Sequence, residues 1–193
     1  MTARLTHPNT VTIFDFGRTP EGMFYYAMEL LEGGTLEDIV LVDGPQAPGR
    51  LVHVLRMVAG ALAEAHGIGL IHRDVKPANI MLCEQGGEHD VAKVLDFGLV
   101  KEARSDTAAA LTQDSHITGT PYYMAPEMIV DPKSVDARAD LYAIGAVGYF
   151  FLTGRNVFEG RSPIEVLSHH LRSEPEPPSK RMGVPVAPDL EAI

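Results

Sequence analysis

Two runs of β-branched and aromatic residues lie near the start of the chain, with turn-forming residues between them. The runs are VTIF (11–14) and MFYYAMEL (23–30), and the stretch between them is DFGRTPEG (15–22). Apolar runs on both sides of such a stretch predict a β-hairpin. The sequence EGGT (32–35) is then expected to break the second strand, because glycine is unfavourable in strands.

Apolar residues recur at helical spacing further along the chain. This spacing predicts an amphipathic helix over residues 50–67 that ends at Gly67. Its apolar face consists of Leu51, Val54, Leu55, Val58 and Leu62. A short helix is expected before it at TLEDIV (35–40), with Thr35 as the capping residue.

Three further helices are predicted in the second half of the chain, at APEMIV (125–130), ADLYAIGAVGYFFL (139–152) and SPIEVLSHHL (162–171). The second is strongly apolar but too short to span a bilayer, which is typical of a buried helix. The third begins with a capping box, with Ser162 at the cap and Glu165 at the third helical position.

Polar residues surround a second predicted hairpin. Its strands are IMLC (80–83) and VAKVL (91–95), joined by EQGGEHD (84–90). Asn79 precedes the outgoing strand and Asp96 follows the returning one, so both are expected at the open end. Facing residues of antiparallel strands have Cα atoms roughly 4.5–5.5 Å apart. A carboxamide oxygen and a carboxylate are therefore expected side by side, near Asp74 and Lys76.

The tripeptide Asp-Phe-Gly occurs twice, at 15–17 and at 96–98. Two hard oxygen ligands, combined with substrate phosphates, are a typical way to hold Mg²⁺, and Asn79 with Asp96 supply such a pair. Asp15 is instead expected at the turn end of the first hairpin, where no second polar cluster faces it. We therefore predict that Asp96 binds metal and that Asp15 does not.

The composition narrows the class of protein. The chain has 193 residues, of which 45% are hydrophobic and 22% charged, and its formal net charge is -10. An acidic surface repels phosphate backbones and anionic lipid, so no nucleic acid partner is expected, and no membrane segment is predicted. Cys83 is the only cysteine, which excludes an internal disulfide and fits a reducing, cytoplasmic setting.

Several motifs follow one another in a particular order. HRDVKPAN (72–79) precedes DFG (96–98) and APE (125–127), and further segments are LTHPNTVTIFDFG, AMELLEGGTL, GTPYYMAPE and DLYAIG. This order resembles that of eukaryotic-like, bacterial-type serine/threonine protein kinases. The resemblance implies an α+β, protein kinase-like fold. Residues 1–31 would be a β-hairpin remnant of the small lobe with the hinge, and residues 32–193 a mostly helical large lobe that lacks its last helices.

The resemblance also implies roles for the polar cluster in transfer of the ATP γ-phosphoryl group to Ser/Thr hydroxyls of protein substrates. Asp74 would orient the acceptor hydroxyl and accept its proton. Lys76 would contact the γ-phosphate, and Asn79 and Asp96 would bind Mg²⁺ ions. Asp140 would hold the catalytic loop through hydrogen bonds to its backbone.

The resemblance implies an adenine pocket and a regulatory segment as well. Met28 would be the gatekeeper residue, backbone groups of Glu29 and Leu31 would meet the adenine edge, and Met81 would form the floor under the ring. Arg73 would pair with a phosphate on the activation segment. The candidate hydroxyls of this segment are Thr112, Ser115 and Thr118, and Thr120 with Lys76 is typical of the serine/threonine class.

The sequence departs from the family pattern in three parts. It contains no glycine-rich phosphate loop after a strand, no third-strand lysine and no glutamate of the regulatory helix. Together with the missing last helices, these absences predict a domain truncated at both ends. The alternative is a catalytically inactive kinase-fold binding or regulatory module. A small-molecule kinase of the same core is disfavoured by GTPYYMAPE (119–127), a peptide-docking segment.

Two other features are given structural interpretations. Lys93 follows Val91 and Ala92 in a pattern like that of an ATP-binding lysine, but it leads directly into Asp96 and is interpreted as a surface lysine. The pair His169–His170 is expected on an exposed helix face, with no metal site.

Overall fold

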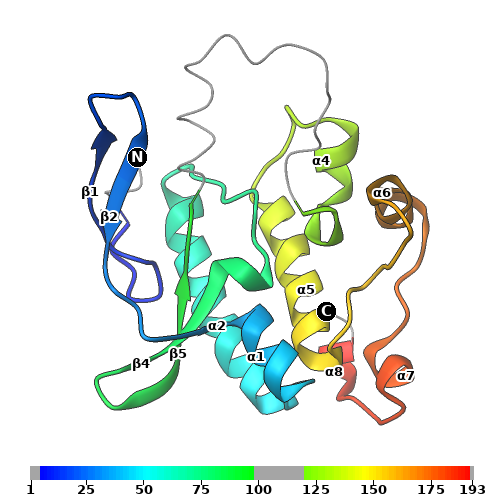
Figure 1. Cartoon of the computed structure of the whole chain (residues 1–193). Coiled ribbons are helices and arrows are strands. Elements are labelled where there is room, and N and C mark those ends of the chain that lie inside the picture. Colours follow the sequence, from blue (N-terminus) through cyan, green and yellow to red (C-terminus); the bar gives the residue numbers. More distant parts are fainter. Residues whose placement is uncertain (1–4, 98–119, 192–193) are drawn as a thin grey trace.

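The computed structural model describes residues 5–97 and 120–191. A two-stranded hairpin lies at one edge of the molecule, and a body of helices around a small sheet makes up the rest (Figure 1). The hairpin consists of β1 (Ile13–Arg18) and β2 (Phe24–Met28). The segment after β2 leads from the hairpin into the helical body.

The register of the first hairpin corrects one prediction. Asp15 pairs with Ala27 inside the antiparallel ladder, and Arg18 pairs with Phe24 next to the turn. Asp15 is therefore a strand residue and not a turn residue, because the turn begins only after Arg18. Its side chain is exposed, and it accepts a hydrogen bond from the backbone N–H of Phe16 at 2.9 Å.

The second sheet has three strands in the order β3–β4–β5. Its strands are β3 (Gly33–Thr35), β4 (Ile80–Gln85) and β5 (Glu88–Val94), and β4 is antiparallel to both neighbours. The second strand of the first hairpin ends at Met28, in agreement with the predicted break, but Gly33–Thr35 then form a separate strand in which Gly33 pairs with Cys83. Gly33 has φ 155°, and a Cβ there would lie 2.0 Å from the carbonyl oxygen of Leu82, so only glycine allows this close pairing.

The main core lies between this sheet and the central helices. Helix α1 (Leu36–Asp43) begins with the predicted cap, since Thr35 Oγ1 accepts the N–H of Asp38 at 3.1 Å. Helix α2 (Pro48–Gly67) buries the predicted apolar face against the sheet and against α5 (Arg138–Thr153). Helix α5 is buried on most sides, as its apolar sequence predicts.

Two 3-10 turns and four helices complete the fold of the described ranges. They are the 3-10 turns η2 (Pro77–Asn79) and η3 (Pro121–Tyr123), and helices α4 (Pro126–Val130), α6 (Pro163–Arg172), α7 (Pro178–Met182) and α8 (Pro188–Glu191). The predicted capping box of α6 is half formed: Ser162 Oγ accepts the N–H of Glu165 at 3.3 Å, but the Glu165 carboxylate accepts the N–H of Arg161 at 2.7 Å and not that of Ser162. Among the described residues, no helix combines the length and the apolar character needed to cross a bilayer.

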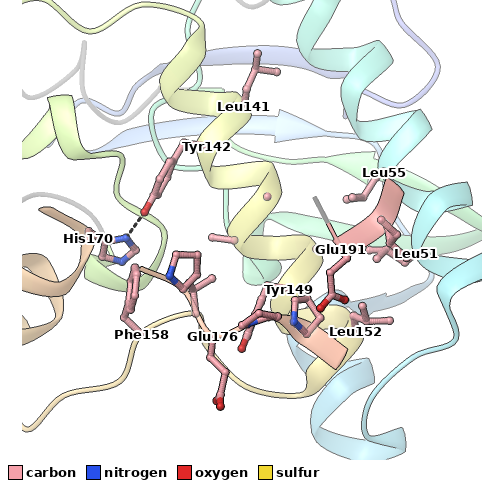
Figure 2. A pocket seen from close by; sticks show the side chains of 18 of the residues that line it. Leu51, Leu55, Leu141, Tyr142, Tyr149, Leu152, Phe158, His170, Glu176 and Glu191 are labelled. Carbon is pink, nitrogen blue, oxygen red and sulfur yellow. Dashed lines mark hydrogen bonds between the residues drawn. The ribbon is translucent and has the colours of Figure 1, made fainter. Parts of the chain in front are cut away.

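An apolar cavity of about 400 Å³ lies between α2, α5 and the segment that follows α6 (Figure 2). Its lining includes Leu51, Leu55 and Leu152, and it includes none of the residues predicted to carry chemistry. His170 also borders this cavity, and its side chain is 6% exposed, so the expected exposed position is wrong for this residue. Its Nδ1 lies 2.6 Å from the hydroxyl of Tyr142, and burial lowers the pKa of His170.

Candidate active site

The loop 72–79 is held from below by a buried carboxylate. Asp140 on α5 is 1% exposed and accepts the backbone N–H of His72 at 2.9 Å and that of Arg73 at 2.8 Å. A third donor comes from α2, where Nε2 of His66 lies 2.7 Å from the same carboxylate. Three donors satisfy the buried charge, so Asp140 fixes the loop as predicted.

His72 is an internal support of this loop. Its side chain is fully buried, and its ring lies 4.8 Å from that of Phe97. Nε2 donates to the carbonyl of Leu95 at 2.8 Å, and Nδ1 accepts the N–H of Asp74 at 3.3 Å. These partners require a neutral ring with its proton on Nε2. Burial lowers the pKa of His72, which agrees with that neutral form.

Three predicted catalytic side chains lie in contact. Lys76 Nζ donates to Asp74 Oδ2 at 3.1 Å, and both side chains are partly exposed. Asn79 Nδ2 donates to the backbone carbonyl of Asp74 at 2.8 Å and to Asp74 Oδ2 at 3.3 Å. The partly exposed carboxylate of Asp74 thus lies between the ammonium group of Lys76 and the carboxamide of Asn79, where it can accept a proton from a bound hydroxyl.

At the open end of the β4–β5 hairpin, Asn79 is hydrogen-bonded to Leu95, the residue that precedes Asp96. The N–H of Leu95 donates to the carbonyl of Asn79 at 2.9 Å, just beyond the Ile80–Val94 pair. Asp96 has φ 55°, a left-handed conformation that is uncommon outside glycine and often marks functional sites. Arg73, at the start of the loop 72–79, has φ 64° and is a second site residue in this conformation.

The side chains of Asn79 and Asp96 fit a hard metal ion. The side-chain hydrogen bonds of Asn79 to described residues both use Nδ2, which leaves Oδ1 as an available ligand. Asp96 Oδ1 accepts the hydroxyl of Tyr26 at 3.3 Å, while Oδ2 has no such bond within the described ranges. No group of three His, Cys, Asp or Glu side chains forms a metal cluster within residues 5–97 and 120–191. A metal here would need further oxygen ligands from a substrate.

The predicted adenine-contacting residues lie at the end of β2, in the segment that follows it, and in β4. Met28 ends β2 and is 44% exposed. Glu29 follows it, and its backbone N–H donates to Thr12 at 3.0 Å, so only its carbonyl remains for a ligand. Leu31 is half-buried, and Met81 is half-buried on β4 opposite Lys93.

A match to a family model decides the class of the protein. The model that describes the protein kinase domain matches residues 1–182. The chain belongs to the protein kinase family.

The relatives of this kinase chain include bacterial enzymes. It is 40% identical over 193 residues to the serine/threonine-protein kinase pkn3 of Myxococcus xanthus, covering 99% of this chain and 35% of pkn3. It is 43% identical over 194 residues to the serine/threonine-protein kinase PknB of Mycolicibacterium smegmatis, covering 99% of this chain and 30% of PknB. The chain therefore spans about a third of the length of these curated relatives.

A solved structure supports the fold assignment. The kinase chain is similar to a crystal structure of Rad53 1-466 in complex with AMP-PNP, with a TM-score of 0.68 and 28% identity over 86% of this chain and 39% of that chain. The predicted α+β, protein kinase-like fold is confirmed.

The predicted regulatory residues of the kinase are only partly described. Thr112, Ser115 and Thr118 lie outside the described residues. Thr120 is half-buried and lines a small cavity together with Arg73 and Asp74, so it lies beside the loop 72–79.

Two site residues of this kinase escaped sequence analysis. Lys93 is 4% exposed, so its interpretation as a surface lysine is wrong, and it forms an ion pair with Glu29 at 3.0 Å. Tyr26 bonds to Asp96 across a separation of 70 residues. One feature of the sequence could have indicated the burial of Lys93: its neighbours in VAKVL (91–95) are all apolar. A lysine in a strand that is buried on both faces needs a partner of opposite charge.

Proposed function

We propose that this chain carries the catalytic region of a serine/threonine protein kinase, which transfers the γ-phosphoryl group of ATP to Ser or Thr hydroxyls of protein substrates. One observation carries the proposal: Asp74 contacts Lys76 and Asn79, next to the hairpin end that holds Asp96. We also propose a division into a small-lobe and hinge segment (1–31) and a large lobe (32–193), in a cytoplasmic protein.

The proposed mechanism uses the polar cluster as it lies. The acceptor hydroxyl oxygen bonds to the γ-phosphorus while the bond from that phosphorus to the β,γ-bridging oxygen breaks, and ADP leaves with the electron pair. Asp74 orients the hydroxyl and takes its proton. Lys76, whose Nζ lies 3.1 Å from Asp74, offsets negative charge that develops on the transferred group.

Mg²⁺ fits the remaining oxygen donors. Asn79 through Oδ1 and Asp96 through its carboxylate would hold it, and the ion would neutralise charge on the ATP phosphates. The exposed carboxylate of Asp15 lies in another hairpin and takes no part.

The base of ATP is assigned to the segment after β2. The carbonyl of Glu29 and the backbone of Leu31 would bond to the adenine edge, with Met28 behind the ring and Met81 beneath it. Backbone groups at these positions suit adenine because its edge presents a donor next to an acceptor. The regulatory assignment pairs Arg73 with a phosphate on Thr112, Ser115 or Thr118, and Thr120 is assigned to the same segment as a residue typical of the serine/threonine class.

The alternative is a kinase-fold module that binds nucleotide or protein without transfer. The sequence contains no glycine-rich loop that follows a strand. The loss of one preorganised charge-stabilising group typically costs about a hundred- to a thousand-fold in rate. We therefore expect binding of Mg·ATP by the purified chain with very slow transfer.

The test combines binding with product analysis. The purified chain is titrated with ATP in the presence and absence of Mg²⁺, and then incubated with Mg·ATP and peptides that carry Ser, Thr or Tyr as the only acceptor. The proposal predicts Mg²⁺-dependent binding and slow labelling of Ser and Thr peptides that is lost in Asp74→Asn. Binding that does not depend on Mg²⁺, or labelling confined to Tyr peptides, would contradict it.

A further inference from the structure

A buried lysine connects the strand before Asp96 with the segment assigned to adenine. The Nζ of Lys93 lies 3.0 Å from Oε1 and 3.2 Å from Oε2 of Glu29. The side chains are 5% and 18% exposed. A lysine removed from water in this way needs its partner, because an unpaired buried ammonium is costly.

Glu29 is held by a third segment as well. Its Oε1 accepts the N–H of Thr12 at 2.7 Å, and its own N–H donates to the carbonyl of Thr12 at 3.0 Å. Burial alone would raise the pKa of Glu29, but the bonds from Thr12 and Lys93 lower it overall. The carboxylate is therefore ionised and anchored from two sides.

The segment around Thr12 is itself bonded to β5. The N–H of Val94 donates to the carbonyl of Asn9 at 2.7 Å, and the N–H of Val11 donates to the carbonyl of Val94 at 3.0 Å. The side chain of Asn9 donates to the carbonyl of Ala92 at 2.7 Å. A closed ring of contacts thus joins residues 9–12, the hinge segment (29–31) and β5. In this ring, the ion pair between Lys93 and Glu29 connects β5 to the hinge segment.

The position of Lys93 gives this ring a role in the site. Lys93 lies opposite Met81 in the β4–β5 ladder, so the two side chains share one face of the sheet. It precedes Asp96 by three residues, and Glu29 directly follows Met28. A single ion pair therefore joins the strand that leads to the metal ligand to the backbone that would meet the base.

We propose that Lys93 is a positioning residue that fixes the hinge segment to β5 and thereby sets where the nucleotide base lies relative to Asp96. The inference rests on the proposed function, because that function assigns the base and the metal ion. A role in stability alone is a weaker explanation, since apolar replacements of buried ion pairs are often neutral or stabilising. What an apolar pair cannot supply is a directional link between two segments.

The first test measures hinge motion without any nucleotide. Amide hydrogen exchange is followed at residues 29–32 and in α2 for the wild-type chain, Lys93→Met and Glu29→Gln. The matched control is Lys180→Met, because Lys180 is 74% exposed and pairs with Glu176 at 3.5 Å on the surface. We expect hinge exchange to rise about tenfold in both pair variants, with α2 and the control unchanged.

The second test measures the selectivity of the hinge for its base. Dissociation constants for Mg·ATP and Mg·GTP are compared in the same variants. A released hinge should reduce the ATP-to-GTP affinity ratio about tenfold, or about 1.4 kcal/mol, whereas a general loss of folded protein weakens both nucleotides equally. Lys93→Arg keeps the charge and should retain most of the selectivity. The double variant of Lys93→Met and Glu29→Gln leaves no unpaired buried charge and should still not recover the ratio.

The outcomes separate this inference from the function on which it rests. A wild-type chain that binds no ATP contradicts the proposed function and the nucleotide part of the inference, while hydrogen exchange still decides whether Lys93 fixes the hinge. Unchanged hinge exchange in both Lys93→Met and Glu29→Gln overturns the inference. So does an equal rise in the hinge and in α2, or an unchanged ATP-to-GTP ratio in a wild-type background that binds ATP.

Discussion

Asp140 holds the backbone of Arg73 through a 2.8 Å hydrogen bond, although the two residues are 67 positions apart in the sequence. The carboxylate is buried and also accepts from His72 and His66. Because Arg73 has φ 64°, this bond stabilises a backbone conformation that is intrinsically unfavourable. The central helix α5 thus fixes the backbone at the start of the loop 72–79.

Replacement of Asp140 tests this support. Asp140→Asn presents an NH₂ group to at least one of the three donors and removes the charge, so we expect a loss of about 2–4 kcal/mol in unfolding free energy. Urea denaturation is the measurement. Asp136→Asn is the control, because Asp136 pairs with Arg138 at the surface and should change stability by less than about 0.5 kcal/mol. Equal effects of the two changes would refute the assigned role.

The two Asp-Phe-Gly copies make opposite predictions. Asp96→Asn removes a charged oxygen ligand at the hairpin end and should weaken Mg²⁺-dependent ATP binding at least about tenfold. Asp15→Asn should leave it unchanged, because Asp15 is exposed in β1. Calorimetric titration with and without Mg²⁺ measures both variants. Similar losses in the two would overturn the metal assignment.

Tyr26 reports on the charge of Asp96. The negative charge of Asp96, with partial burial and the 3.3 Å hydrogen bond, raises the pKa of Tyr26 above its ordinary value of 10.0. In Asp96→Asn the main cause disappears, so the pKa of Tyr26 should fall. An NMR titration of ¹³Cζ-labelled tyrosine measures this shift, with Tyr26→Phe identifying the signal. An unchanged pKa would mean that Asp96 is not ionised beside the phenol.

His72 predicts how stability depends on pH. Burial lowers the pKa of His72 from its ordinary 6.5, so the folded state binds fewer protons than the unfolded state once the pH falls below that value. The contribution is therefore fully present above pH 6.5 and is lost as the pH falls toward the lowered pKa of the folded state. The slope should approach about 1.4 kcal/mol per pH unit for this one group.

Urea denaturation at several pH values between 8 and 5 measures the slope. His89→Gln is the control, because His89 is 79% exposed and should leave the slope unchanged. A free energy of unfolding that stays constant from pH 7 to pH 5 would show that His72 is not held neutral.

Sequence patterns predicted those parts of the molecule in which local periodicity and burial agree. The faces of α2 and α5, the cap of α1 at Thr35 and the antiparallel pairing of β4 with β5 follow from spacing and from the turn residues between the two strands. These features depend on contacts within one element or between neighbouring strands.

The predictions that are wrong mostly concern contacts between residues that are far apart in the sequence. The buried Lys93 forms its ion pair with Glu29, which is 64 positions away. Strand β3 pairs with β4, which follows α2 in the sequence. Asp15 was misplaced because a turn-like composition extended over residues that are in fact paired. No local pattern carries the position of a distant partner, so a charged residue in a strand was assigned to the surface.

The two left-handed residues of the site, Arg73 and Asp96, have a consequence for the thermodynamics of ligand binding. A non-glycine residue in the left-handed region costs of order 1–3 kcal/mol. In the folded chain this cost is offset at Arg73 by the hydrogen bond to Asp140, and next to Asp96 by the hydrogen bond between Leu95 and Asn79. The backbone around Arg73 and around Asp96 therefore has this conformation before any ligand binds. Association with a nucleotide should therefore lose little conformational entropy in these segments, and its heat signature should reflect contacts and desolvation rather than ordering of the chain.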